Sequence, residues 1–236
     1  MSDLLGITGV NRRVDLLYEL IESELSAEAK QRLWERSRAR WRQSEPNADL
    51  TWKIEISGDD FMSKLSSYGV FSSEKSILEI GAGYGRLLRS CLRRGITFKR
   101  YTAIDISSKN VDYLREHFQR EDIQIVLGDI EKVSFNTRFD VVFSSLTFKH
   151  LYPSFEKALH NVANFANPGC MFFFDLIEGK RRGFESDGTT YSRWYSRSEI
   201  LEILSRTSTE FVAFDQVRHA PSYSRLLVIA RQTAHP

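Results

Sequence analysis

The chain alternates between short apolar runs and longer segments whose apolar residues recur at helical spacing. The short runs predict seven strands, at about 77–80, 101–104, 123–127, 139–143, 171–176, 211–217 and 226–230. Helical segments separate all of these runs except the last two. Helical crossovers make neighbouring strands parallel, whereas a strand joined without a helix returns antiparallel. We therefore predict an α/β fold with a doubly wound, mainly parallel seven-stranded sheet whose last strand is antiparallel.

Residues 1–70 precede this alternation of strands and helices. A helix is predicted from about 12 to 43, and Pro46 follows its end because the residue before a proline avoids the helical conformation. A second helix is predicted to begin near 57–60. We predict two parts, a helical unit over 1–70 and a core over 71–236.

Composition and charge narrow the class of protein. With 42% hydrophobic residues among 236, the chain is too apolar to be intrinsically disordered. A formal net charge of +2 argues only weakly for a nucleic-acid partner, so none is expected. Two cysteines make neither a disulfide framework nor a four-thiolate zinc site. No apolar run is long enough to cross a membrane, so we expect a soluble, cytoplasmic protein without a membrane partner.

A glycine-rich segment links the first predicted strand to the following helix. It begins at Glu79 and has glycines at Gly81, Gly83 and Gly85. Such a turn lets backbone amides approach a ligand near the positive end of a helix. Its G-x-G-x-G spacing differs from the dinucleotide fingerprint G-x-G-x-x-G, whose third glycine is replaced here by Arg86. A dehydrogenase is therefore disfavoured, although it remains an alternative.

The chain resembles the class I S-adenosylmethionine-dependent methyltransferases. Their first motif, E/D-x-G-x-G-x-G, matches the glycine-rich segment completely. Further matches follow at successive strand ends: Asp105 after the second strand, Asp129 and Ile130 after the third, 139–144 as the fourth strand, and 167–169 as a Pro-Gly turn. The resemblance implies the Rossmann-like methyltransferase fold and S-adenosylmethionine as cofactor.

The resemblance also implies a set of cofactor-binding residues. It implies that Asp105 binds the ribose hydroxyls, that Asp129 binds the adenine amino group, and that Ile130 packs on the adenine ring. The expected cofactor-binding residues are Glu79, Gly81, Ala82, Gly83, Gly85, Asp105, Ile106, Asp129, Ile130 and Ser144. Taken singly, three of these residues also have a structural explanation. Asp105 could cap a helix, Asp129 could be an ordinary turn residue, and Glu79 could hold the glycine loop by accepting backbone hydrogen bonds.

Acceptor-site candidates come from the segments outside these motifs. His150 is the candidate general base, and His219, between the last two strands, is a second candidate catalytic residue. Residues that would contact the acceptor are Trp52, Tyr191, Arg193 and Tyr195. All of these aromatic and histidine residues also fit structural roles. The segment after the fourth strand has neither an Asn/Asp-Pro-Pro-aromatic motif, nor a cysteine, nor an acidic cluster, so no metal site is expected.

These observations favour one function over several alternatives. The expected reaction is O-methylation of a sugar or secondary-metabolite hydroxyl by in-line displacement, with 1–70 as a lid over the site. The first alternatives are N-methylation of a small amine and a non-catalytic cofactor-binding protein of the same fold. An RNA or protein methyltransferase is a further alternative, and a homodimer is possible in each case.

Overall fold

A computed structural model describes residues 24–47, 58–220 and 223–233, with the side chains of 218–220 and 223–224 excepted. The acceptor candidate Trp52 lies outside the described residues. So does most of the first half of the helix expected over 12–43.

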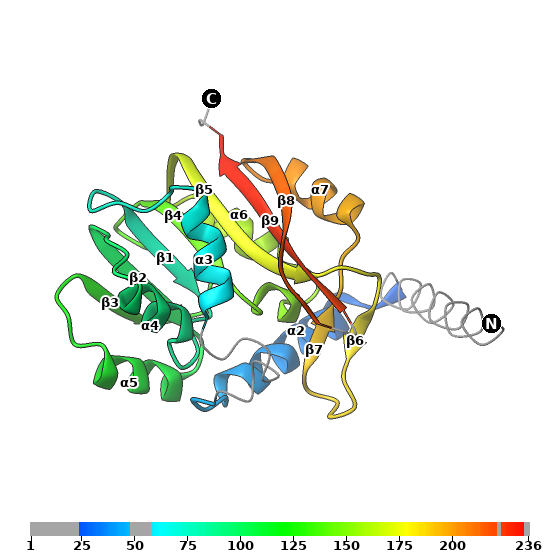
Figure 1. The fold of residues 1–236 in the computed structure, drawn as a ribbon. Coiled ribbons are helices and arrows are strands. Elements are labelled where there is room, and N and C mark those ends of the chain that lie inside the picture. Colours follow the sequence, from blue (N-terminus) through cyan, green and yellow to red (C-terminus); the bar gives the residue numbers. More distant parts are fainter. Residues whose placement is uncertain (1–23, 48–57, 221–222, 234–236) are drawn as a thin grey trace.

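The main sheet has seven strands in the order β3-β2-β1-β4-β5-β9-β8 (Figure 1). Strands β1 to β5 are parallel, and β9 is antiparallel to both of its neighbours. The predicted sheet and its antiparallel last strand are therefore confirmed. The strands are β1 Ser76–Ile80, β2 Arg100–Asp105, β3 Ile123–Leu127, β4 Phe139–Ser144, β5 Ala166–Ile177, β8 Thr209–Ala220 and β9 Tyr223–Gln232.

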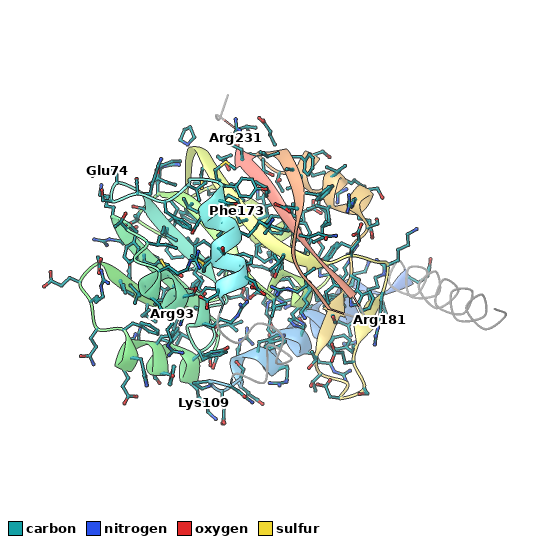
Figure 2. All side chains as sticks on the ribbon, in the orientation of Figure 1. Glu74, Arg93, Lys109, Phe173, Arg181 and Arg231 are labelled. Atoms are coloured by element: carbon teal, nitrogen blue, oxygen red, sulfur yellow. The ribbon has the colours of Figure 1, made fainter. Side chains whose placement is uncertain are left out.

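Helices cover both faces of this sheet, and apolar side chains fill the two layers between them (Figure 2). Helices α3 (Asp59–Ser67), α4 (Arg86–Arg93) and α5 (Ser108–His117) lie on one face. Helices α6 (Glu156–Ala163) and α7 (Arg197–Ser205) lie on the other. Successive residues of β9 alternate between the two cores, as the two-residue period of a doubly covered strand requires.

The region expected to be one N-terminal unit contributes in two ways. Helix α2 (Ala27–Arg42) ends four residues before Pro46 and crosses the carboxyl edge of the sheet (Figure 1). Helix α3 instead packs its Phe61, Met62 and Leu65 into the core between the sheet and α4. A lid over 1–70 remains a prediction, and α2 is the described part positioned for it.

Two segments differ from the expected pattern. The region 178–195, predicted as a loop, contains a two-stranded antiparallel ribbon, β6 (Arg182–Phe184) and β7 (Tyr191–Arg193). The ribbon packs on Trp34 of α2 through Phe184 and Tyr191, and this long-range contact leaves no periodic signal in so short a segment. The turn expected at 167–169 is a bulge within β5, since Phe139 pairs with Ala166 but Val141 pairs with Met171.

Candidate active site

The glycine loop connects β1 to α4 and forms one wall of a pocket. The amides of Gly81 and Ala82 both donate to the Ile104 carbonyl, at 2.8 and 3.2 Å, which ties the loop to β2. Gly81 has φ +72°, and a Cβ there would lie 2.1 Å from Thr147 Oγ1, so only glycine fits. Gly83 has φ +56°, and a Cβ there would meet no atom within 4 Å. The loop therefore leaves free space beside Gly83.

Asp105 ends β2 and holds the loop through its carboxylate. Oδ2 accepts the Gly83 amide at 2.8 Å, and Oδ1 accepts the Ser107 amide at 2.9 Å and Asn110 Nδ2 at 3.2 Å. Burial raises the pKa of Asp105 above its usual value, and these N–H donors act in the opposite direction. The carboxylate is thus fixed in place at the pocket wall. Ser44 joins the network by accepting from Asn110 and from the Ser107 hydroxyl.

Asp129 lies beyond β3 and is joined to α2 by a buried ion-pair network. Arg38 lies 3.3 Å from Asp129 Oδ2 and 2.5 Å from Glu131 Oε1. Trp34 Nε1 donates to the other Glu131 oxygen at 2.7 Å. Because the Arg38 side chain is only 2% exposed, this contact fastens α2 against the loop after β3.

His150 ends the short helix η2 (Phe148–His150), which follows β4. Its Nδ1 lies 2.6 Å from the Tyr191 carbonyl oxygen, which only accepts, so Nδ1 carries the proton and Nε2 is left as an acceptor. The imidazole packs on Trp41, with ring centroids 4.4 Å apart. Burial, together with the nearby Lys149 charge, lowers the pKa of His150 well below its usual value, so the ring is neutral at physiological pH.

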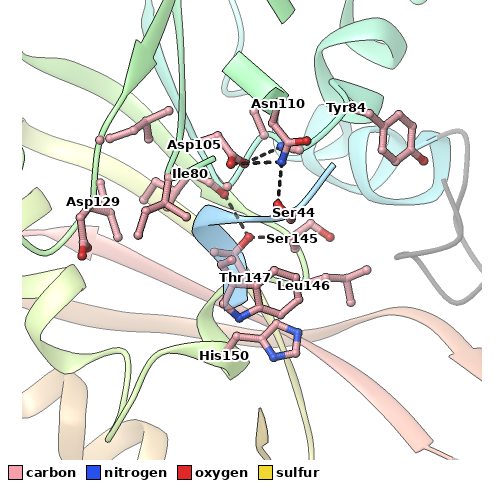
Figure 3. Close-up of a pocket in the computed structure, with 18 of the residues that line it drawn as sticks. Ser44, Ile80, Tyr84, Asp105, Asn110, Asp129, Ser145, Leu146, Thr147 and His150 are labelled. Carbon is pink, nitrogen blue, oxygen red and sulfur yellow. Dashed lines mark hydrogen bonds between the residues drawn. The ribbon is translucent and has the colours of Figure 1, made fainter. Parts of the chain in front are cut away.

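These elements surround one pocket at the carboxyl edge of the parallel strands (Figure 3). That edge is where ligands bind in doubly wound folds. Of the residues expected to bind the cofactor, the pocket is lined by Gly81, Ala82, Gly83, Asp105, Ile106, Asp129 and Ile130. His150, the candidate base, lines it too.

Three of the expected cofactor residues lie behind the pocket wall. Glu79 is buried and accepts the Tyr101 hydroxyl at 2.5 Å, and burial raises the pKa of Glu79 to about 7. Gly85 begins α4, where a Cβ would lie 2.7 Å from the Leu114 side chain. The Ser144 hydroxyl donates to the Ile80 carbonyl at 3.1 Å. Within the described residues, all three support the loop from outside the pocket.

The acceptor candidates on the ribbon also lie outside the pocket lining. Tyr191 and Arg193 both donate to the Pro153 carbonyl, at 3.2 and 2.7 Å, and Tyr195 is buried in the core. His219 belongs to β8, paired with Ser224, rather than to a connection between the last two strands, and its side chain is outside the described residues. Tyr191 nevertheless reaches the site through its main chain, because its carbonyl orients His150.

Several pocket residues have no motif that marks them in the sequence. They come from α2 and the segment after it, from the starts of α4 and α5, and from the turn after β4. They include Arg38, Trp41, Ser44, Arg86, Asn110, Ser145, Leu146 and Thr147. Helical spacing marks Trp41 as an aromatic on α2, but nothing local shows that α2 crosses this edge.

Comparison with known proteins agrees with the geometry. Residues 78–174 match the family model of a methyltransferase domain. Over these residues the chain is similar to a methyltransferase domain. The cofactor of such a domain is S-adenosylmethionine. The matched residues span β1 to β5 and so include the glycine loop, Asp105 and Asp129.

The methyltransferase domain has relatives with several acceptors. A malonyl-[acyl-carrier protein] O-methyltransferase of Acetivibrio thermocellus is 35% identical over 62% of this chain and 56% of its own length. A fatty-acid O-methyltransferase of Mycolicibacterium smegmatis is 32% identical over 42% of this chain and 36% of its own. A probable ribosomal RNA small subunit methyltransferase A of Thermococcus sibiricus is 31% identical over 48% and 43%. The chain thus spans about half or less of the length of these curated relatives.

Solved structures of methyltransferases share the fold of most of this chain. The 1,6-didemethyltoxoflavin-N1-methyltransferase of Burkholderia thailandensis has a TM-score of 0.71 at 20% identity, covering 89% of this chain and 92% of its own. A glycopeptide N-methyltransferase has a TM-score of 0.61 at 16% identity, covering 74% and 90%. At these identities the likeness establishes the fold.

Metal-ligand clusters and membrane-spanning helices are both missing from the part of the chain that the structure describes. No group of three or more His, Cys, Asp or Glu side chains there is arranged to hold a metal ion. No helix there is long and apolar enough to span a bilayer.

Proposed function

We propose that this chain transfers a methyl group from S-adenosylmethionine to an oxygen atom of a small molecule. The observation that carries the proposal is the pocket itself. It joins the glycine loop and Asp105 on one side to Trp41, Leu146 and His150 on the other, within one lining.

The residues along the first side fit the adenosyl part of the cofactor. Free space beside Gly83 lets a ligand approach the backbone, and Asp105 is held at the wall with acceptor capacity for hydroxyls. Asp129 and Ile130 border the same space and offer an acceptor and an apolar surface for adenine. Arg38 and Ser44 connect both of these carboxylates to α2 and the residues after it, so α2 closes over the cofactor as a lid.

The residues along the second side fit methyl transfer to oxygen. Bound S-adenosylmethionine would supply a methyl carbon on a sulfonium: the acceptor oxygen would form a bond to that carbon, the carbon–sulfur bond would break, and S-adenosylhomocysteine would leave. His150 presents an unprotonated Nε2 to accept the proton that a hydroxyl acceptor loses. Trp41 covers the imidazole and excludes water from it.

Two acceptor classes fit a pocket of this kind. A hydroxyl of a sugar or secondary metabolite is the first candidate, because His150 can accept the proton that such a hydroxyl loses on methylation. A carboxylate is the second candidate, because the names of two relatives specify O-methylation of a malonyl group and of fatty acids. A carboxylate needs no base, since it loses no proton on methylation. The near-neutral charge of +2 argues against RNA as the acceptor.

The test measures S-adenosylhomocysteine release with a fixed panel of acceptors: methyl α-glucoside, catechol, octanoate, benzylamine and a ribosomal RNA fragment. The proposal predicts turnover with at least one oxygen acceptor and none with the RNA. Turnover with RNA alone contradicts it. Binding of S-adenosylhomocysteine without turnover on any acceptor indicates the non-catalytic alternative. Calorimetry that detects binding of a nicotinamide cofactor but not of S-adenosylhomocysteine contradicts S-adenosylmethionine as the cofactor.

A further inference from the structure

Leu146 has an unusual backbone conformation within the turn after β4. Its φ is +63°, and it is the one non-glycine residue with a positive φ among the residues described. Branched side chains rarely adopt this left-handed conformation, which glycine adopts without strain. The Leu146 side chain lines the pocket. Figure 3 places it on the opposite side of the pocket from Asp129.

One buried carboxylate holds this turn. Asp175, on β5, accepts the Leu146 amide at Oδ1 (2.6 Å) and the Ser145 hydroxyl at Oδ2 (3.0 Å). Two consecutive residues of the turn are therefore fixed to the two oxygens of a single side chain. Asp175 is 2% exposed, so no water competes for these hydrogen bonds.

Two arginines complete the support from other elements. Arg225 of β9 donates to Asp175 and, at 3.0 Å, to the Ser145 hydroxyl oxygen. Arg86 of α4 donates to the same oxygen at 2.5 Å. Burial acts against the charged form of Asp175, but Arg225 and the Leu146 amide outweigh it and hold the pKa of Asp175 below its usual value. Replacing a buried ion pair with apolar residues is often neutral or stabilising, so stability alone gives little reason for this pair.

Strain at Leu146 and the buried pair behind it point to one role. We propose that Leu146 is a specificity-determining residue that packs against an apolar part of the acceptor, and that Asp175 and Arg225 are positioning residues that hold it there. A glycine would form the same turn without strain but would offer no side chain to the acceptor. This inference rests on the proposed function and narrows it to an acceptor with an apolar group beside the methylated oxygen.

The first experiment tests the role of the Leu146 side chain. Wild type, Leu146→Ala and the control Leu127→Ala, at a residue 50% exposed and outside the pocket, are assayed with catechol and octanoate. Leu146→Ala is expected to lower kcat/KM on the order of tenfold, the usual effect of trimming an apolar pocket. The dissociation constant for S-adenosylhomocysteine, measured by calorimetry, is expected to change less than about twofold, because the lost contact is with the acceptor alone. Unchanged kcat/KM, or an equal loss of S-adenosylhomocysteine affinity, overturns the proposal.

The second experiment tests whether Asp175 and Arg225 act through Leu146. Asp175→Asn is expected to lower kcat/KM as Leu146→Ala does, and the double variant is expected to lose no more than either single variant. Amide exchange of the peptide over 143–149, with S-adenosylhomocysteine bound, is expected to accelerate in Asp175→Asn. It is expected to stay unchanged in the control Asp215→Asn, a residue in a partly exposed pair with Lys64. Additive losses, or unchanged exchange in Asp175→Asn, contradict the positioning role.

Two further variants keep the test decisive. If Asp175→Asn does not fold, Ser145→Ala removes the hydrogen bond to Asp175 and those from Arg225 and Arg86 but keeps the Asp175–Arg225 ion pair, and Arg225→Lys retains the charge. Ser145→Ala is expected to accelerate exchange and Arg225→Lys to preserve part of the activity. If wild type methylates no acceptor in the panel, the proposed function fails, while the exchange measurements still decide whether Asp175 holds the turn.

Discussion

The two sides of the pocket are built in different ways. On the cofactor side, the glycine loop and Asp105 lie 22 residues apart and contact each other through backbone amides. On the acceptor side, the contacts that hold the turn after β4 join residues 29 to 80 positions apart, each through at least one side chain. The glycine loop and Asp105 therefore form a local motif, whereas the acceptor side exists only when β5, β9, α2 and the ribbon have assembled.

Gly81 is the point where the two sides meet, and its replacement gives the largest expected effect. In Gly81→Ala, the new methyl group collides with the Thr147 side chain, and φ is strained. We expect a loss of about 3 kcal/mol in the free energy of unfolding, from overpacking and backbone strain together. Gly83→Ala is the matched control, since its methyl group meets no atom within 4 Å. Urea denaturation should show a loss of only about 1 kcal/mol there, from strain alone.

Thr147 offers a second check on that contact. Combining Gly81→Ala with Thr147→Ala removes the two closest atoms of the collision and should recover part of the lost stability. Equal destabilisation by Gly81→Ala and Gly83→Ala would mean that the two sides do not touch as described.

His150 tests the acceptor side by itself. With a hydroxyl acceptor such as catechol, His150→Gln should lower kcat on the order of a hundredfold, because the proton acceptor is lost. The affinity for S-adenosylhomocysteine should be unchanged. Since the pKa of His150 lies well below its usual value, the base is already deprotonated at neutral pH. Wild-type kcat/KM should then be flat above about pH 6.5, and fall only as pH drops through that lowered pKa. A wild-type rise between about pH 6.5 and 8 would assign the proton transfer to another group.

Asp105 tests the cofactor side. Asp105→Asn keeps the shape of the side chain but removes the charge, and should weaken S-adenosylhomocysteine binding by about 1.5–3 kcal/mol. Calorimetry measures this directly, and Asp122→Asn, in an exposed surface pair with Arg120, is the control. Full affinity in Asp105→Asn would remove its carboxylate from the binding site.

The sequence was informative where structure is local. The seven strands and the antiparallel last strand follow from periodicity and from the presence or absence of a helix between strands, and the structure confirms them. The glycine loop also stands where its motif indicates. A local pattern determines these features because each depends on neighbours in sequence.

What the sequence did not predict depends on distant contacts. The ribbon β6–β7 is too short for a periodic signal and is stabilised by packing on Trp34. Arg38, Asp175 and Arg225 carry no motif, because each is defined by a partner on another element. Tyr191 is expected from the sequence to contact the acceptor, but its side chain lies outside the pocket lining. Its carbonyl oxygen contacts His150 instead. A main-chain contact of this kind does not depend on the residue type, so the sequence does not indicate it.

The central claim is that one pocket receives the cofactor at Asp105 and Asp129 and the acceptor at Leu146 and His150. A crystal structure of the protein with S-adenosylhomocysteine tests it most directly. The account predicts ribose hydroxyls on the Asp105 carboxylate, adenine beside Asp129 and Ile130, and sulfur directed toward Leu146 and His150. Adenine on the Leu146 side, or a ligand bound outside this pocket, would contradict it.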